Sequence, residues 1–117
     1  MKILGLIGGI SWVSTVDYYK LINQGINEKL GGLNFSRCII FSFNYADIKK
    51  NNDTNNWEAT FQMLVEACEH LKASGAEAIV LCANTMHLWV QLHKRVKSAM
   101  ASKTLSQFRL RLILAYL

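Results

Sequence analysis

Residues 75–87 read Gly75-Ala76-Glu77-Ala78-Ile79-Val80-Leu81-Cys82-Ala83-Asn84-Thr85-Met86-His87. The glycine ends a helical pattern, residues 78–82 are apolar enough for a buried strand, and a compact polar turn follows. In an open parallel sheet, ligands bind beyond the carboxyl ends of the strands. The polar turn therefore predicts a site for a small anion, at the end of a strand in such a sheet.

The chain before this stretch alternates strand and helix patterns. Apolar runs predict strands near residues 2–7 and 37–43, in addition to 78–82. Helical spacing predicts helices over residues 15–30, through residues 61–71, and from residue 87 to about 100. The order βαβαβα predicts a three-layer α/β fold with a parallel sheet, in which right-handed crossovers place the first strand between the other two.

The predicted helices have recognisable ends. Ser11 or Ser14 can cap the helix over residues 15–30, and Gly31-Gly32 ends it. Its apolar stripe consists of Tyr18, Ile22, Ile26 and Leu30. Residues 51–56 form a polar loop, and the last asparagines of that loop can cap the next helix. The tryptophans at the predicted helix starts, Trp12 and Trp57, are interpreted as packing anchors.

Composition limits the class of protein. A chain of 117 residues with 51% hydrophobic content forms one small domain. It has no run of about 18 apolar residues, and its first residues lack a signal peptide, so we expect no membrane span and no secretion. Three cysteines, widely spaced, predict free thiols, a cytoplasmic location and no metal site.

The net charge of +5 comes from the end of the chain. Residues 1–93 hold seven Lys/Arg and eight Asp/Glu, whereas residues 94–117 hold six Lys/Arg and no acid. Only Phe108 and Tyr116 accompany these basic residues, so we expect no nucleic-acid binding. Residues 108–117 are either a fourth strand or a segment without a selected role.

The first strand ends in a glycine-rich turn, Gly5-x-x-Gly8-Gly9. Such a turn either lets backbone N–H groups approach an anion at a helix N-terminus or is only a tight turn. It lacks the spacing of a dinucleotide site and the lysine of a phosphate-binding loop. The turn therefore indicates a small ligand if it binds one at all.

The third strand ends in residues with the same ambiguity. Asn84-Thr85 either binds a ligand or caps a helix, and His87 is either an acid/base group or a capping or packing residue. Cys82 is the only thiol near the predicted cleft, whereas Cys38 and Cys68 are interpreted as core residues.

Taken together, these motifs resemble the aspartate/glutamate racemase family over about residues 1–93. The matching residues are Gly5–Trp12, Ser14-Thr15, Tyr18-Tyr19, Leu21-Ile22-Asn23, Leu30-Gly31-Gly32-Leu33, Asp47-Ile48, Trp57, Gly75-Ala76-Glu77 and Asn84-Thr85-Met86-His87. The resemblance implies cofactor-independent racemisation, in which two similar α/β halves enclose a cleft and each supplies one acid/base group for proton transfer at Cα. It implies aspartate or glutamate as ligand and these binding residues: Gly8, Gly9, Ile10, Ser11, Asn52, Ala83, Asn84 and Thr85.

This sequence departs from the family pattern at three points. The family's first catalytic position, a Cys or Thr directly before Asn-Thr, is Ala83 here. Cys82 is the remaining candidate, but adjacent strand residues point to opposite faces, so we expect its thiol to point away from the cleft. Asn52 replaces a longer Gln, and the second half with its cysteine is absent.

We therefore predict a racemase-like domain over residues 1–93, truncated there, and a basic divergent tail over residues 94–117. The predicted function is that of an amino-acid racemase family member that is catalytically incomplete as this chain. The alternatives are a noncatalytic binder of acidic amino acids and an interaction module that uses the basic tail. A homo-oligomer is compatible with each.

Overall fold

The computed structural model describes residues 1–83. Several predictions concern later residues and lie outside this range: the helix from residue 87, the fourth strand at 108–117, the basic tail, and the roles of Asn84, Thr85 and His87. The boundary at residue 93 also lies there.

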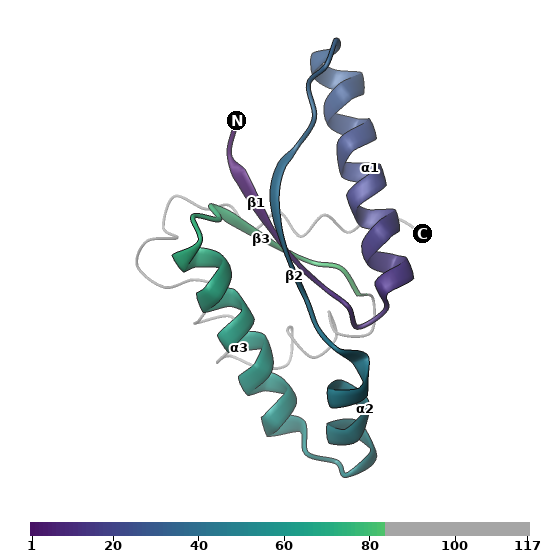
Figure 1. The fold of residues 1–117 in the computed structure, drawn as a ribbon, viewed down its shortest axis with the longest axis vertical. Coiled ribbons are helices and arrows are strands. Elements are labelled where there is room, and N and C mark those ends of the chain that lie inside the picture. The colour runs from purple at the N-terminus through teal and green to yellow at the C-terminus, as the bar shows by residue number, and fades with distance from the viewer. Residues whose placement is uncertain (84–117) are drawn as a thin grey trace.

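Three strands and three helices make up the described part. They are β1 (Ile3–Gly8), α1 (Trp12–Leu30), β2 (Arg37–Ser42), α2 (Tyr45–Asp53), α3 (Trp57–Ala73) and β3 (Ala78–Leu81). The strands form one parallel sheet in the order β2-β1-β3 (Figure 1). The predicted α/β fold, the three strands and the central place of the first strand are confirmed.

β1 is hydrogen-bonded on both edges. Ile3 to Gly8 pair with Arg37 to Ser42 of β2, and Leu4 to Ile7 pair with Ala78 to Leu81 of β3. The ladder continues past β3, where the Cys82 N–H donates to the Ile7 carbonyl at 2.8 Å. Both faces of β1 are also covered, since the side chains of Leu6 and Ile7, which point to opposite faces, are almost fully buried.

Helices lie on both sides of the sheet, α1 on one and α3 on the other (Figure 1). The α3 side holds a core of Ile7, Leu81 and Ala83 with the inward face of α3, which includes Phe61, Leu64, Cys68 and Leu71. The α1 side holds a smaller core of Leu6, Tyr18, Val80 and Cys82. The prediction that Cys68 is a core residue is confirmed, and Cys38 packs against the smaller core.

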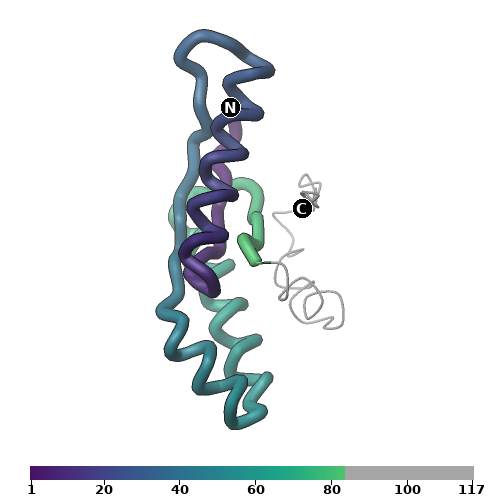
Figure 2. The backbone as a smooth tube through the Cα atoms, turned by 90° about the vertical axis from the view of Figure 1, so that its right-hand side faces the viewer, coloured from purple at the N-terminus to yellow at the C-terminus, as the bar shows by residue number. Residues whose placement is uncertain are grey.

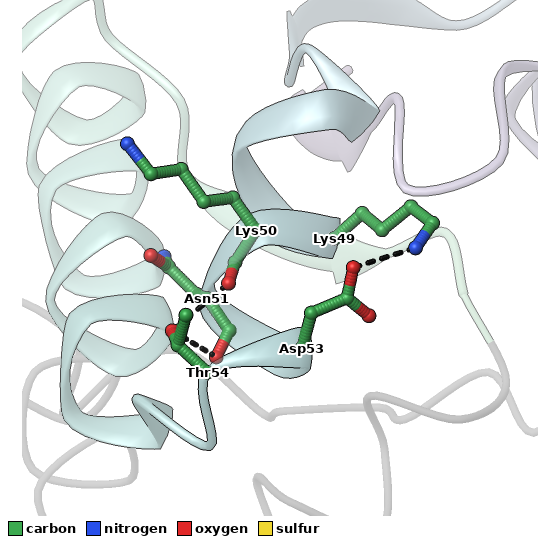
Figure 3. Close-up of polar contacts among 5 residues, drawn as sticks. All are labelled: Lys49, Lys50, Asn51, Asp53 and Thr54. Atoms are coloured by element: carbon green, nitrogen blue, oxygen red, sulfur yellow. Dashed lines mark hydrogen bonds and ion pairs between the residues drawn. The ribbon is translucent and has the colours of Figure 1, made fainter.

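The predicted loop at residues 51–56 is wrong in its first half, because residues 51–53 belong to α2. The asparagines made this segment read as a loop, since Asn has low helix propensity. Tertiary packing overrides that propensity through Ile48, which is 1% exposed. Thr54 then closes the helix by donating to the Lys50 and Asn51 carbonyls at 2.9 and 3.2 Å, beside an exposed Lys49–Asp53 ion pair (Figure 3). Asn56 caps α3, as predicted.

α1 begins earlier than predicted, at Trp12, and of the two predicted caps Ser11 is the one in place. The expected stripe packs only in part: Tyr18 is buried and Ile22 contacts the smaller core, whereas Leu30 is 56% exposed. Figure 1 shows the reason, because the last turns of α1 run beyond the sheet. The interpretation of Trp12 as a packing anchor is wrong, since this side chain is 71% exposed. Trp57 does pack against the larger core.

The larger core generates a stability prediction. Leu64 is 1% exposed, and Leu64→Ala should lower the free energy of unfolding by about 2–5 kcal/mol, because it removes buried methyl groups and leaves a cavity. Leu33→Ala is the matched control, since Leu33 is 93% exposed and its truncation should change stability by less than about 0.5 kcal/mol. Urea unfolding measures both; equal losses would contradict the packing described.

Candidate functional site

The connection from β1 to α1 is held in a tight conformation that requires both of its glycines. A Cβ on Gly8 would overlap the side chain of Thr15. Gly9 has a φ of +82°, and a Cβ there would overlap the backbone of Phe43. The Phe43 N–H in turn donates to the Gly8 carbonyl at 2.9 Å, so the end of β1 is tied to the segment after β2. The glycine pair is therefore needed for close packing, whatever else it does.

Thr15 fixes this connection from inside the first turn of α1. Its buried hydroxyl accepts the Gly9 N–H at 3.0 Å and donates to the Ser11 carbonyl at 3.0 Å. Ser11 also caps the helix, since its hydroxyl accepts the Ser14 N–H at 3.3 Å. The Thr15 side chain thus positions both the end of β1 and the start of α1.

A pocket of about 590 Å³ opens at this connection. Its lining residues within the described range come from the β1–α1 connection and the start of α1, from the start of α2 and from the segment after β3; they are Gly9, Ile10, Ser11, Trp12, Ser14, Tyr45 and Ala83. The pocket therefore lies beyond the carboxyl ends of the parallel strands, where connections leave the central strand and its neighbours in different directions.

The pocket suits a small anion better than a cation. Among the described residues, none that lines it is Asp, Glu, Lys, Arg or His. α1 begins at the pocket, and its first turn has no acidic residue. The N–H groups of a first helical turn lack acceptors within the helix and carry the positive end of the helix dipole. Serine hydroxyls at Ser11 and Ser14 add further hydrogen-bonding groups.

Cys82 and Ala83 lie on opposite faces of the sheet. Ala83 belongs to the larger core and lines the pocket, whereas Cys82 is 0% exposed and packs with Leu6 and Tyr18 on the α1 side. Burial, and to a smaller extent the nearby Cys38, raises the pKa of the Cys82 thiol to about 12. Burial and then Cys82 likewise raise the pKa of Tyr18. The thiol next to the pocket is thus protonated and turned away from it.

Comparison with known proteins identifies the family of this chain. The model of the family described as Asp/Glu/Hydantoin racemase matches residues 7–98, which is well over half of the chain. This chain belongs to the Asp/Glu/hydantoin racemase family.

Two solved structures share its fold. One is a proposed Asp/Glu racemase from Yersinia pestis, 42% identical with a TM-score of 0.79, and the match covers 86% of this chain and 43% of that protein. The other is an aspartate racemase homologue from Pyrococcus horikoshii OT3, 33% identical with a TM-score of 0.75, covering 86% and 42%. The racemase-family chain spans less than half the length of either relative.

The structure brings together four of the residues predicted to bind substrate, namely Gly9, Ile10, Ser11 and Ala83, around one pocket. Gly8 is buried behind them and Asn52 lies in the last turn of α2, so neither lines it. The Asn52 Oδ1 atom is buried and accepts no hydrogen bond within residues 1–83. That the four residues contact substrate stays a prediction.

Sequence reasoning missed Trp12, Ser14 and Tyr45 as pocket residues. The sequence indicates Ser14 as a possible helix cap and as part of the family resemblance, but not as a residue of the pocket. Predicting Tyr45 as a pocket residue requires predicting α2, because Tyr45 is the first residue of that helix and Asn44 caps it.

The hydroxyl of Thr15 should contribute measurably to stability. Thr15→Val keeps the shape of the side chain but removes the partner of a buried N–H, and it should cost about 1–3 kcal/mol in urea unfolding. Thr54→Val is the control, because the Thr54 hydroxyl makes its bonds on the exposed surface of α2, where the loss should stay below about 1 kcal/mol. A Thr54 variant that loses as much as the Thr15 variant would rule out the special role of the buried hydroxyl.

The thiol of Cys82 should be nearly inert in the folded chain. With a pKa near 12, its thiolate fraction at pH 8 is roughly a thousandfold below that of an ordinary cysteine, and alkylation by iodoacetamide should be slower by that factor or more. The rate should rise about tenfold per pH unit until the pKa is reached. An Ala83→Cys variant should react faster than Cys82 at pH 8, because residue 83 lines the pocket. Peptide mapping by mass spectrometry separates the two positions; rapid labelling of Cys82 would contradict its placement.

Proposed function

We propose that this racemase-family chain supplies one side of an amino-acid racemase cleft. In this proposal the pocket holds aspartate or glutamate, and the chain does not racemise it alone. The observation that carries the proposal is the methyl group of Ala83 at the pocket wall, beside a thiol that is buried on the other face of the strand. Among residues 1–83, position 83 of this proposed binding surface thus carries no acid/base side chain of the kind that the reaction needs.

Binding rests on the start of α1. A carboxylate placed in the pocket can accept hydrogen bonds from N–H groups of the first helical turn, where the helix dipole favours negative charge. The N–H groups of Gly9 and Ser14 are not among them, because they already donate to Thr15 and to Ser11. The glycine turn therefore shapes the pocket, while α1 and the serine hydroxyls provide donors. Asn84 and Thr85 follow directly in the sequence and are proposed to complete the contacts.

Racemisation requires two positioned groups. One base removes the proton from Cα, and an acid on the opposite side returns a proton to the other face of the resulting carbanion. The carbon–hydrogen bond that breaks and the one that forms lie on opposite faces, so one wall of a cleft cannot supply both groups. Each missing group lowers the rate by roughly 10²–10⁴-fold. With Ala83 on this wall, we expect negligible turnover.

The proposed reaction transfers only protons, so the proposal includes no cofactor. A reducing, cytoplasmic setting is part of the same proposal, because Cys38, Cys68 and Cys82 are all free thiols. Within residues 1–83, no helix is long and apolar enough to cross a membrane. The alternative of an interaction module depends on residues 94–117, which lie outside the described part.

Titration with L-aspartate, followed by amide NMR, tests the binding half of the proposal. We expect shifts at Ile10, Ser11 and Ala83, because these residues line the pocket. L-Asparagine is the matched ligand control: it has the same size without the side-chain charge, and its shifts should be smaller. Shifts confined to residues 94–117 would count against the proposed site.

The same sample in D₂O tests the catalytic half. We expect no deuterium incorporation at Cα of L-aspartate or L-glutamate above the protein-free rate. Cys82→Ala is the control for the only thiol near the pocket. Exchange that is robust in the natural chain and lost in Cys82→Ala would overturn the proposal and make Cys82 the base.

A further inference from the structure

The polar side chains of the pocket come from two helices. The start of α1 contributes the hydroxyls of Ser11 and Ser14, and the start of α2 contributes the phenol hydroxyl of Tyr45. Figure 1 and Figure 2 show these two helix starts near each other, at the same end of the sheet. Among the described lining residues outside the β1–α1 segment, Tyr45 is the one with a polar side chain, because the other is Ala83.

Contacts on both sides of Tyr45 hold its backbone at the pocket. Before it in sequence, the Phe43 N–H donates to the Gly8 carbonyl at 2.9 Å, and the Phe43 ring packs against the larger core. After it, Ile48 anchors α2, since this side chain is 1% exposed. The side chain of Tyr45 itself is 51% exposed. A ligand in the pocket can therefore reach this side chain without any rearrangement of α2.

The start of α1 has hydrogen-bond donors for one carboxylate. The Ser14 N–H already donates to the Ser11 hydroxyl at 3.3 Å, and the Thr15 N–H donates to the Ser11 carbonyl at 3.1 Å. Within residues 1–83, the N–H groups of Trp12 and Val13 have no acceptor. Two N–H groups match the two oxygens of a single carboxylate. Aspartate and glutamate each carry two carboxylates, so the second one needs a donor elsewhere in the pocket.

We infer that Tyr45 determines the preference of the pocket for acidic amino acids, because its hydroxyl donates to the carboxylate that α1 does not bind. The inference rests on the proposed function, since it requires that the pocket hold aspartate or glutamate. A hydrogen bond to an ionised carboxylate is stronger than one between neutral groups. The contact with Tyr45 therefore favours a ligand with a second carboxylate over a ligand without one.

The charged side chains of α2 do not replace this hydroxyl. Lys49 lies one helical turn after Tyr45 and does not line the pocket. Its ammonium group is 2.6 Å from the carboxylate of Asp53 on the exposed surface (Figure 3). A neutral hydroxyl also differs from a cation in one useful respect, because it does not repel the ammonium group of the amino acid.

A comparison of two ligands and two variants tests the inference. The full chain is titrated with L-aspartate and with L-alanine, which lacks the side-chain carboxylate, and amide NMR gives each dissociation constant. We expect Tyr45→Phe to raise the dissociation constant for L-aspartate about tenfold and to leave that for L-alanine within about twofold. Tyr19→Phe is the matched control, because Tyr19 is an exposed tyrosine of α1 outside the pocket; both constants should stay within about twofold.

Two outcomes would overturn the inference and leave the proposed function standing. One is a Tyr45→Phe variant that binds L-aspartate as tightly as the natural chain or loses affinity equally for both ligands. The other is a preference for L-aspartate that is kept in Tyr45→Phe and lost in Lys49→Met. If L-aspartate shifts none of Ile10, Ser11 and Ala83 in the natural chain, the proposed function fails and the inference fails with it. Circular dichroism verifies that each variant is folded.

Discussion

The rest of this fold depends on β1, which is hydrogen-bonded along both of its edges and packed on both of its faces. Its backbone pairs with β2 and β3, and Leu6 and Ile7 each anchor one of the two cores. At Gly5 the strand has little room for a side chain, since a Cβ there would lie 3.0–3.2 Å from Ala76 and Leu71. The position of the pocket also depends on β1, because the pocket opens where β1 ends and α1 starts.

The alternation of side chains along parallel strands also decides the chemistry at the end of β3. Ile7 pairs with Leu81, so residues 81 and 83 face the α3 side with Ile7, and residues 80 and 82 face the α1 side with Leu6. Moving a thiol by one residue along a strand thus moves it to the opposite face of the sheet and into the other core. The difference between Cys82 and Ala83 is one of environment: one is sealed in a core that keeps its thiol protonated, and the other is a methyl group at the pocket wall.

The sequence predicted the parts of the structure that local patterns specify. The three strands, their order and the opposite orientations of Cys82 and Ala83 follow from periodicity and crossover handedness. A serine cap, at Ser11 or Ser14, follows from the residue types before α1, and the structure has it at Ser11. What it missed depends on tertiary packing. α2 forms around Ile48 in a segment whose asparagines favour loops, and without α2 neither the place of Asn52 nor that of Tyr45 could be known. The exposure of Trp12 could likewise not be predicted from the sequence, because periodicity does not say which side of a helix is covered.

The placement of the earliest strand at the centre of the sheet has a consequence for synthesis on the ribosome. Of the described strands β1 is made before the others, yet one of its edges pairs with β3, and the Ile3 N–H donates to Glu77 across 74 positions in sequence. The backbone N–H and C=O groups on that edge therefore stay unpaired with β3 until nearly all of the described chain has been made. Contacts of such long range form slowly and leave an unpaired edge available to other chains. The nascent chain depends for that interval on the β1–α1–β2 unit, whose pairing needs far shorter loops to close.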